Sequence, residues 1–253
     1  MDLFDFLNLQ FQRRIVRKFD KASNYGWAIT RLKKVPGKTD LILEIGSMDA
    51  LDAIFFKKYF SSRVIAVEPA PLNVMTCLEN VRQAGFDSND SVEILELCLI
   101  DKSGSVEFLN VVPEKYGNTG ASSIFQIDFE NRAQSDPDFG RESVQEKISV
   151  RAARFDALEI AIPHTIFMDV QGSELLALKG FGEKLGGVTN IVFETTFNSN
   201  YFGGCTFLEI DTFLRENGFT YASSDVFGKR RPRISKYFEK NREFNVFYSK
   251  SDN

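Results

Sequence analysis

One short segment, residues 41–50 with the sequence LILEIGSMDA, constrains the fold of this chain more than any other. It joins the apolar run LILEI to Gly46, and the helix-like sequence LDAIFFKKYF follows at once. An apolar run, a tight turn and a helix form the opening unit of a doubly wound α/β domain, in which the turn passes beneath a ligand. Because glycine has no Cβ, Gly46 lets the backbone bend and approach that ligand closely.

The turn alone is an incomplete nucleotide-binding motif. A dinucleotide site needs G-x-G-x-x-G, whereas Met48 and Ala50 stand where further glycines are expected. Support comes from Glu68, which ends the next apolar run and lies about 20 residues beyond the first turn. In nucleotide-binding α/β folds an acid at this place accepts hydrogen bonds from ribose hydroxyls. A surface acid with no ligand is the alternative for Glu68.

The bulk composition excludes several classes of protein. With 253 residues, 43% of them hydrophobic, the chain suits one large α/β domain and is not disordered. Its net charge of −4 provides no basic field for nucleic acid. The three cysteines are far apart, which argues against disulfides and zinc and fits a reducing compartment. No signal peptide and no transmembrane segment is recognisable, so we expect a cytoplasmic protein.

The remaining elements follow from hydrophobic periodicity and turn residues. We expect helices over residues 2–34, 51–60, 72–84 and 206–217, and strands over residues 63–67, 92–97, 166–170, 189–193, 218–225 and 243–250. The turn at residues 101–104 predicts a hairpin-like pair formed by the strand before it and the alternating run SVEFLNV. The first helix is expected to cover one side of the sheet, with an oligomer contact or a lid as its alternative.

Four acids stand at or near the carboxyl ends of predicted strands: Glu44, Glu68, Asp169 and Glu194. Parallel strands bring these ends to one rim, where open α/β sheets bind their ligands. His164 begins its strand at the opposite end, so we expect no catalytic role for it. The basic loop at residues 228–233 is expected to be solvated, with contact to an anionic substrate or lipid headgroup as the alternative.

A family resemblance rests on residues 168–180, MDVQGSELLALKG. This segment resembles the D-[VL]-[EQ]-G-x-E-x-x-x-L-K-G block of the FkbM-type methyltransferases, which use S-adenosylmethionine. Weaker similarities follow the family's order over residues 40–225, in EIGSMDALDA, VIAVEPAPLN, LCLIDKSGSVEF, NTGASSIF and NIVFE. Glu44 stands where the family usually has Asp, and Met48 and Ala50 replace the usual Asn and Gly.

The resemblance implies an α/β, Rossmann-like class I methyltransferase fold. Its sheet would have seven mostly parallel strands with the last strand antiparallel, plus N-terminal helices. The chain would divide into an N-terminal helical extension, 1–36, and a methyltransferase domain, 37–253. The implied activity is transfer of a methyl group from S-adenosylmethionine to a hydroxyl of a small molecule or saccharide. A homo-oligomer is compatible with it.

The resemblance also implies a layout of the cofactor site along the rim. The expected contacts are Glu44, Gly46 and Ser47 at the methionine part, Glu68 and Pro69 at the ribose, Cys98 and Leu99 beside the adenine, and Asp169 at the methyl group.

Removing the proton of an acceptor hydroxyl requires a general base or a metal ion. Asp169 is the first candidate for the base or for a ligand to a divalent metal, with a structural acid capping the turn at Gly172 as its alternative. Glu194 would orient the acceptor or a metal. Ser122, Ser123 and Glu174 are expected on the substrate side, although a carboxylate at position 174 also suits the N-terminus of its own helix.

Two other functions compete with this hypothesis. Glu68 would also suit the ribose of a nicotinamide cofactor in an oxidoreductase, against which the missing glycines and the 169–180 block argue. A degenerate, non-catalytic member that binds a partner is the other alternative, and the residues at positions 48 and 50 favour it.

Overall fold

The computed structural model describes residues 25–29, 31–32, 36–37, 40–86, 92–111, 119–135, 145–233 and 242–250. Most of the expected N-terminal helix, residues 2–34, lies outside the described residues. Within them, α2 (Gly26–Ile29) packs Ala28 and Ile29 into the core beside the sheet. Residues 31–32 are not helical, so the predicted end of this helix at residue 34 is wrong. No helix in these ranges is long and apolar enough to span a membrane.

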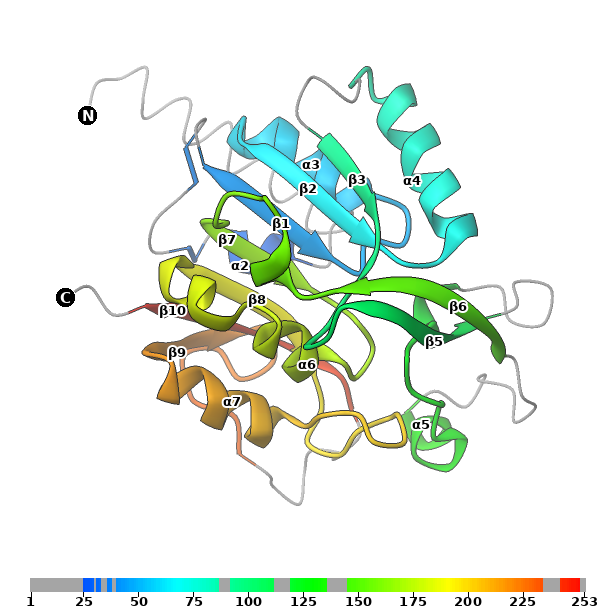
Figure 1. The fold of residues 1–253 in the computed structure, drawn as a ribbon. Coiled ribbons are helices and arrows are strands. Elements are labelled where there is room, and N and C mark those ends of the chain that lie inside the picture. Colours follow the sequence, from blue (N-terminus) through cyan, green and yellow to red (C-terminus); the bar gives the residue numbers. More distant parts are fainter. Residues whose placement is uncertain are drawn as a thin grey trace, which may run out of the picture.

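A seven-stranded sheet organises the molecule (Figure 1). Its strands are β1 (Leu41–Ile45), β2 (Arg63–Glu68), β3 (Val92–Glu96), β7 (Thr165–Met168), β8 (Asn190–Thr195), β9 (Phe219–Ser224) and β10 (Phe244–Lys250). They lie in the order β3-β2-β1-β7-β8-β10-β9, and β10 is antiparallel to both neighbours. The expected mostly parallel sheet with an antiparallel last strand is therefore confirmed.

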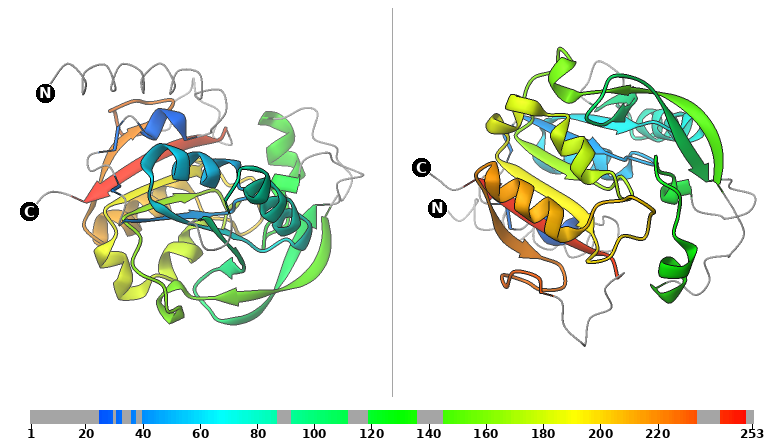
Figure 2. Two further views of the ribbon diagram at one scale, coloured as in Figure 1. Left: turned by 90° about the horizontal axis from the view of Figure 1, so that it is seen from above. Right: turned by 60° about the horizontal axis from the view of Figure 1, so that its bottom comes forward.

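The central strands are apolar because helices cover the sheet on both faces (Figure 2). All residues of β1 and β7 are buried. On one face lie α2, α3 (Leu51–Phe60) and α4 (Pro71–Gln83), and Phe56 of α3 stacks on Phe167 with ring centroids 4.1 Å apart. On the other lie α6 (Glu174–Lys179), the 3-10 helix η3 (Gly182–Gly187) and α7 (Phe207–Glu216). Each predicted helix that falls among these residues is confirmed within one residue at each end.

The predicted hairpin is wrong. The short strand β4 (Cys98–Leu99) and β5 (Gly104–Val111) do not pair with each other, because β6 (Gln145–Ala153) lies between them in a separate three-stranded sheet. β5 is antiparallel to β6 along its whole length, whereas β4 pairs with β6 in parallel over two residues. The longer ladder with β6 offers many more cross-strand pairs than a hairpin with β4 could.

The connection between β5 and β6 carries two short helices towards the rim of the main sheet. These are the 3-10 helix η1 (Thr119–Ala121) and α5 (Phe129–Ser135). Ser123 forms an isolated bridge with Leu109, and Ile127 forms one with Tyr201. A second 3-10 helix, η2 (Phe155–Ala157), leads from β6 towards β7. The three-stranded sheet and its connection therefore border the carboxyl ends of β1, β2 and β7.

Candidate functional site

The turn after β1 is built around one close backbone contact. Gly46 has a φ of +84°, and a Cβ placed there would lie 1.8 Å from the carbonyl oxygen of Asp169. The amide of Asp169 in turn donates to the carbonyl oxygen of Ile45 at 3.0 Å. The loop after β1 and the loop after β7 therefore touch through their backbones, which only glycine at position 46 permits.

The turn keeps a glycine-like shape although glycines are missing. Met48 and Ala50 have φ values of 53° and 60°, both in the left-handed region. Side chains cost about 1 to 2 kcal/mol per residue in that conformation. The amide of Met48 donates to a carboxylate oxygen of Glu68 at 2.9 Å, which helps to hold the turn in place. Met48 and Ala50 therefore occupy a backbone conformation that glycine adopts most readily.

Glu68 ends β2 and is fixed by three donors. Its Oε2 accepts the amide of Met48 at 2.9 Å, and its Oε1 accepts the amide of Ala70 at 2.9 Å and the side-chain amide of Asn73 at 3.3 Å. Burial raises the pKa of Glu68, and these hydrogen bonds oppose the rise. A carboxylate offers about four acceptor positions. One position on Oε2 therefore stays available in the cavity that Glu68 lines.

A first cavity opens above this turn, with an empty volume of about 480 Å³ that includes the space at its mouth. Of the predicted cofactor residues, Gly46, Glu68, Pro69, Cys98, Leu99 and Asp169 line it. Val67, Leu97 and Phe108 add apolar walls, and Ser122 contributes from the loop before α5. Six of the eight predicted cofactor residues therefore line one cavity, together with Ser122 from the predicted substrate side.

Glu44 and Ser47 lie beneath the turn and do not line the cavity. Both are buried, and the Ser47 hydroxyl donates to the Glu44 carboxylate at 2.5 Å. Burial raises the pKa of Glu44 well above its ordinary value, and the neighbouring carboxylate of Asp52 adds to the rise. The pair stabilises the turn from below, and direct contact of these two side chains with a cofactor remains a prediction.

Asp169 and Glu194 stand side by side at the rim. Met168 of β7 is opposite Phe193 of β8, so the next residue along each strand brings the two acids onto neighbouring strands. Adjacent strands lie about 4.8 Å apart. β8 extends two residues beyond its expected end at residue 193, so Glu194 belongs to the strand itself. The predicted meeting of these carboxylates at one rim agrees with the structure.

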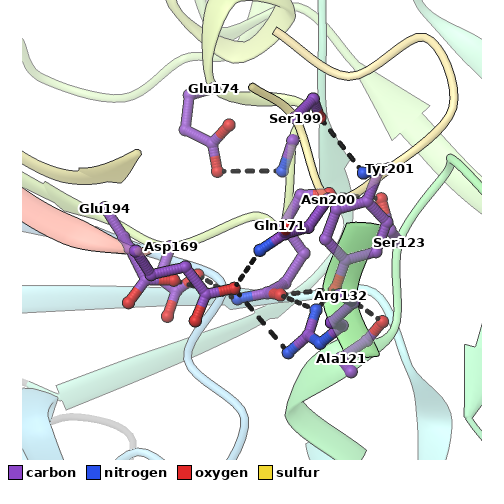
Figure 3. A network of polar contacts seen from close by, with 12 residues as sticks. Ala121, Ser123, Arg132, Asp169, Gln171, Glu174, Glu194, Ser199, Asn200 and Tyr201 are labelled. Atoms are coloured by element: carbon purple, nitrogen blue, oxygen red, sulfur yellow. Dashed lines mark hydrogen bonds and ion pairs between the residues drawn. The ribbon is translucent and has the colours of Figure 1, made fainter. Parts of the chain in front are cut away.

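Gln171 connects this acidic pair to a second group of side chains (Figure 3). Its side-chain amide nitrogen lies 2.5 Å from Asp169 and 3.5 Å from Glu194. Its side-chain oxygen accepts the Tyr201 hydroxyl at 2.5 Å and the Arg132 guanidinium at 3.3 Å. With a φ of 53°, Gln171 is also in the left-handed conformation. The two ends of the amide are therefore assigned unambiguously by their partners.

Electrostatics at the pair favour the protonated acids. Burial raises the pKa of Asp169 to about 7, and the carboxylate of Glu174 adds to the rise. Burial also raises the pKa of Glu194 well above its ordinary value, with Asp169 as the next cause. The Arg132 guanidinium lowers the pKa of both. Asp169 can therefore exchange a proton near neutral pH, as a general base must.

A second cavity, with an empty volume of about 290 Å³, lies on the other side of the turn after β7. Gln171, Gly172 and Glu174 line it from this turn, whereas Asp169, Val170 and Ser173 line the first cavity. Its remaining wall comes from the end of β8, the loop before α7 and the residue before β10, with Glu194, Thr195, Asn200, Tyr201 and Glu243 among its members. One short turn thus separates the two cavities.

Glu174 holds the turn through its carboxylate. Its Oε1 accepts the amides of Val170 at 3.2 Å and Gly172 at 3.1 Å, and its Oε2 accepts the Cys205 thiol at 3.3 Å. These contacts agree with a structural role for Glu174, the alternative to a role on the substrate side. Its carboxylate fixes the turn that precedes α6. Its side chain still borders the second cavity, where the substrate-side role remains a prediction.

The two serines anchor the loop before α5. The Ser122 hydroxyl donates to the carbonyl of Thr119 and accepts the amide of Val111. The Ser123 hydroxyl donates to the carbonyl of Gln171 at 2.8 Å and is buried. Ser123 lines neither cavity, so its contact with a substrate remains a prediction that the described geometry does not favour. Of the segment NTGASSIF, residues 118–125, residue 118 lies outside the described residues.

Other reactive side chains lie apart from the rim or are inert. His164 precedes β7 and donates its amide to the carbonyl of Leu41, at the amino ends of the strands. Burial raises the pKa of Cys98 to about 12, so its thiol stays protonated beside the cavity. Among the residues that the structure describes, no group of three acidic, histidine or cysteine side chains is arranged to hold a metal ion.

Sequence reasoning missed the partners that organise the acids. Arg132 comes from a polar stretch whose composition predicts only a loop, and Tyr201 from a loop after β8. Their guanidinium and hydroxyl lie 2.7 Å apart. Gln171 lies within the 168–180 block, two residues after Asp169, and this position was the one signal in the sequence that it belongs to the site.

The match to a family model decides the classification. The model of the methyltransferase FkbM domain matches residues 44–221, which is most of the chain. The chain belongs to the FkbM methyltransferase family. The match begins at Glu44 and ends within β9, so it contains both loops that meet at Gly46 and every residue of the rim described above except Glu243.

A solved structure supports the Rossmann-like, class I methyltransferase fold. A methyltransferase FkbM from Methylobacillus flagellatus has a TM-score of 0.51 at 11% identity, over 86% of this chain and 45% of that chain. This FkbM chain therefore spans less than half the length of that structure. Magnesium protoporphyrin IX methyltransferase from Synechocystis, solved with S-adenosylmethionine, has a TM-score of 0.46 at 10% identity, over 96% and 79% of the two chains. Comparison with curated proteins finds no match.

Proposed function

We propose that the protein is an S-adenosylmethionine-dependent O-methyltransferase that acts on a hydroxyl of a small molecule or saccharide. The observation that carries the proposal is the first cavity, with Glu68 on one wall and Asp169 on another. Membership of the FkbM family supplies methyl transfer as the reaction class. The backbone of the turn argues against the degenerate alternative, because Met48 and Ala50 hold the left-handed conformation that glycine adopts readily.

The residues of this cavity fit the cofactor. Gly46 lines the cavity without a side chain to narrow it, and Glu68 keeps an acceptor position for a ribose hydroxyl. Leu97, Leu99 and Phe108 offer apolar surface for a flat base. When bound, the cofactor supplies an electrophilic methyl group on a sulfonium.

The protein's own contribution is to position the acceptor and to take its proton. In-line displacement depends on close, aligned approach of the two reacting atoms. Asp169 stands where it borders the first cavity, and with a pKa of about 7 it is partly ionised at neutral pH. It would accept the proton of the acceptor hydroxyl and so make the oxygen nucleophilic. Gln171 holds the carboxylate in place for that step.

Calorimetric titration tests the proposal. Purified protein is titrated with S-adenosylmethionine, S-adenosylhomocysteine and NAD. We expect the two sulfur nucleotides to bind, and Glu68→Ala to weaken them roughly 10- to 100-fold, because hydrogen bonds to charged groups contribute about 1.5–3 kcal/mol. Glu96→Ala is the matched control, since this exposed glutamate lies opposite Glu68 on β3.

Each outcome has a distinct meaning. Binding lost in Glu68→Ala and retained in Glu96→Ala supports the methyltransferase. Binding of NAD alone would favour the oxidoreductase instead. If none of the three binds, the partner-binding alternative becomes the better explanation.

A further inference from the structure

The Gln171 side chain stands between hydrogen-bond donors on one side and carboxyl groups on the other (Figure 3). Its Oε1 accepts the Tyr201 hydroxyl at 2.5 Å and Nη1 of Arg132 at 3.3 Å. Its Nε2 donates to Oδ1 of Asp169 at 2.5 Å, and a longer contact of 3.5 Å reaches Glu194. The amide therefore carries one donor-to-acceptor direction across the site.

Arg132 is the group that sets this direction. A guanidinium only donates hydrogen bonds, whereas a tyrosine hydroxyl both donates and accepts. Nη1 of Arg132 donates to the hydroxyl oxygen of Tyr201 at 2.7 Å, which leaves the single hydroxyl proton for another acceptor. That acceptor is Oε1 of Gln171 at 2.5 Å, since the carbonyl oxygen of Ala121 is farther away at 3.2 Å. A flipped Gln171 amide would set its own N–H groups against those of Arg132.

Segments far apart in the sequence hold this chain of hydrogen bonds in place. Arg132 comes from α5, Tyr201 from the loop after β8 and Gln171 from the turn after β7. Ile127 and Tyr201 form a backbone bridge, and the Ser123 hydroxyl donates to the carbonyl oxygen of Gln171 at 2.8 Å. Arg132 is 9% exposed and Tyr201 4%. Hydrogen bonds in such a buried network are electrostatically stronger than in water.

The last link of the chain distinguishes the two oxygens of Asp169. Oδ1 accepts Nε2 of Gln171 at 2.5 Å, whereas Oδ2 has no hydrogen-bond partner in the described part of the chain. Because Oδ1 is held as an acceptor, a proton that Asp169 takes up resides on Oδ2. Asp169 borders the first cavity, so this oxygen is the one left for a molecule bound there.

Titratable groups face Asp169 from each element packed around it. They are Tyr25 ahead of α2, Arg132 of α5, Glu174 of α6, Glu194 of β8 and Glu243 ahead of β10. Burial and then the carboxylate of Glu174 raise the pKa of Asp169, whereas the hydrogen bond from Gln171 and the charge of Arg132 lower it. The chain therefore opposes its acidic and apolar surroundings.

We propose that Arg132 is a positioning residue that acts through Tyr201 and Gln171. It keeps Oδ1 of Asp169 hydrogen-bonded and so directs the proton of the acceptor hydroxyl to Oδ2. In that step the O–H bond of the acceptor breaks and its proton bonds to Oδ2, while Nε2 of Gln171 stays on Oδ1. The proposal rests on the proposed function, because it concerns the base of that reaction.

A carboxyl titration tests the proposal. The side-chain carboxyl carbon of Asp169 is followed by NMR as the pH is varied around neutrality, with and without S-adenosylhomocysteine, and Asp169→Asn assigns the resonance. Arg132→Met removes the donor that sets the direction. The pKa of Asp169 should then rise by about one pH unit, since the loss of a hydrogen bond to a charged group is of that order.

Tyr201→Phe separates the chain from the charge. This variant keeps the guanidinium of Arg132 but loses the short link to Gln171. The pKa of Asp169 should rise by less than in Arg132→Met, because Nη1 of Arg132 still reaches Oε1 at 3.3 Å. Melting curves establish that each variant is folded, and Tyr201→Phe, which loses one hydroxyl, carries the test if Arg132→Met does not fold. An unchanged Asp169 titration in Tyr201→Phe would overturn the proposal.

A double variant tests the route through the amide. If Arg132 acts through Gln171, Arg132→Met should raise the pKa of Asp169 much less in a Gln171→Met background than in the wild type. Equal rises in both backgrounds would mean that the charge acts alone and would also overturn the proposal. Arg154→Met is the matched control: it removes a guanidinium that is bonded to Asp156 and lines neither cavity, so the Asp169 titration should stay unchanged.

The two proposals fail in different ways. Absence of S-adenosylhomocysteine binding in the wild type refutes the methyltransferase, and the titration of the free protein then still tests the chain. Normal binding together with an Asp169 titration that is insensitive to Tyr201→Phe refutes only the positioning role of Arg132.

Discussion

Replacing Gly46 with alanine tests whether the rim depends on close contact between two loops. The added Cβ would lie 1.8 Å from the carbonyl oxygen of Asp169 and 2.8 Å from its carbonyl carbon. Ordinary contact begins at 3.4 Å, so one loop must move by about 1.6 Å. Both atoms belong to the backbone, so no flexible side chain can absorb the shift.

The expected loss of stability has two parts. The left-handed conformation costs alanine about 1 to 2 kcal/mol. Crowding in a well-packed region adds about 1 to 3 kcal/mol. A domain of this size loses roughly 2–4 °C in melting temperature per kcal/mol, so the summed cost of about 2 to 5 kcal/mol predicts a fall of roughly 4–20 °C. Displacing Asp169 by this distance should also reduce methyl transfer about 100-fold.

Gly85→Ala is the matched control for this experiment. Gly85 has a φ of +80°, yet nothing lies within 4 Å of the position of its Cβ. It therefore carries the conformational cost alone, about 1 to 2 kcal/mol. Thermal unfolding and S-adenosylhomocysteine titration are measured on both variants. If Gly46→Ala melts no lower than Gly85→Ala and binds with unchanged affinity, the reasoning about backbone contact is refuted.

Three further predictions concern the acidic pair. Gln171→Glu places a negative charge beside Asp169, so the pKa of Asp169 should rise above about 7; a carboxyl titration followed by NMR that is unchanged would contradict this. In the folded protein the pKa of Asp169 is raised from 3.8 to about 7, so its contribution to the free energy of unfolding is present below pH 3.8 and is lost as pH rises through about 7. Asp169→Asn should remove that decline, which urea unfolding at pH 4 and pH 8 measures against wild type. Tyr201→Phe removes the donor to Gln171 and should destabilise the protein by about 1 to 3 kcal/mol; Tyr221→Phe, at a partly exposed hydroxyl bonded to Gly228, is the control, and equal losses would refute a special role for Tyr201.

The sequence predicted the main sheet and its rim because the signals for both are local. Apolar runs that end in acids mark parallel strands and their carboxyl ends, and Glu68, Asp169 and Glu194 follow from that pattern. Glu68 and Asp169 line the first cavity, and Glu194 lines the second. The bounds of α3, α4 and α7 were also predictable, since each shows apolar residues at helical spacing, whereas the short polar helix α5 was not predicted.

Pairings over long sequence separations could not be predicted. Nothing local indicates that β5 would pair with β6 across the long connection between them in preference to the adjacent β4. Arg132 is 39 residues from Gln171, and Tyr201 is 30 residues from it, so the hydrogen bonds between them depend on the fold. The left-handed backbone of Met48 was also hidden, because methionine gives no sign of that conformation.

The turn between the two cavities has a thermodynamic consequence. Within residues 169–174, three residues line the first cavity and the other three line the second. A molecule bound in either cavity therefore contacts the same turn. An occupant that fixes this turn lowers the cost of ordering it for the second occupant, which makes the two binding events cooperative. By linkage the coupling free energy is equal in both directions, so each occupant must strengthen binding of the other by the same factor.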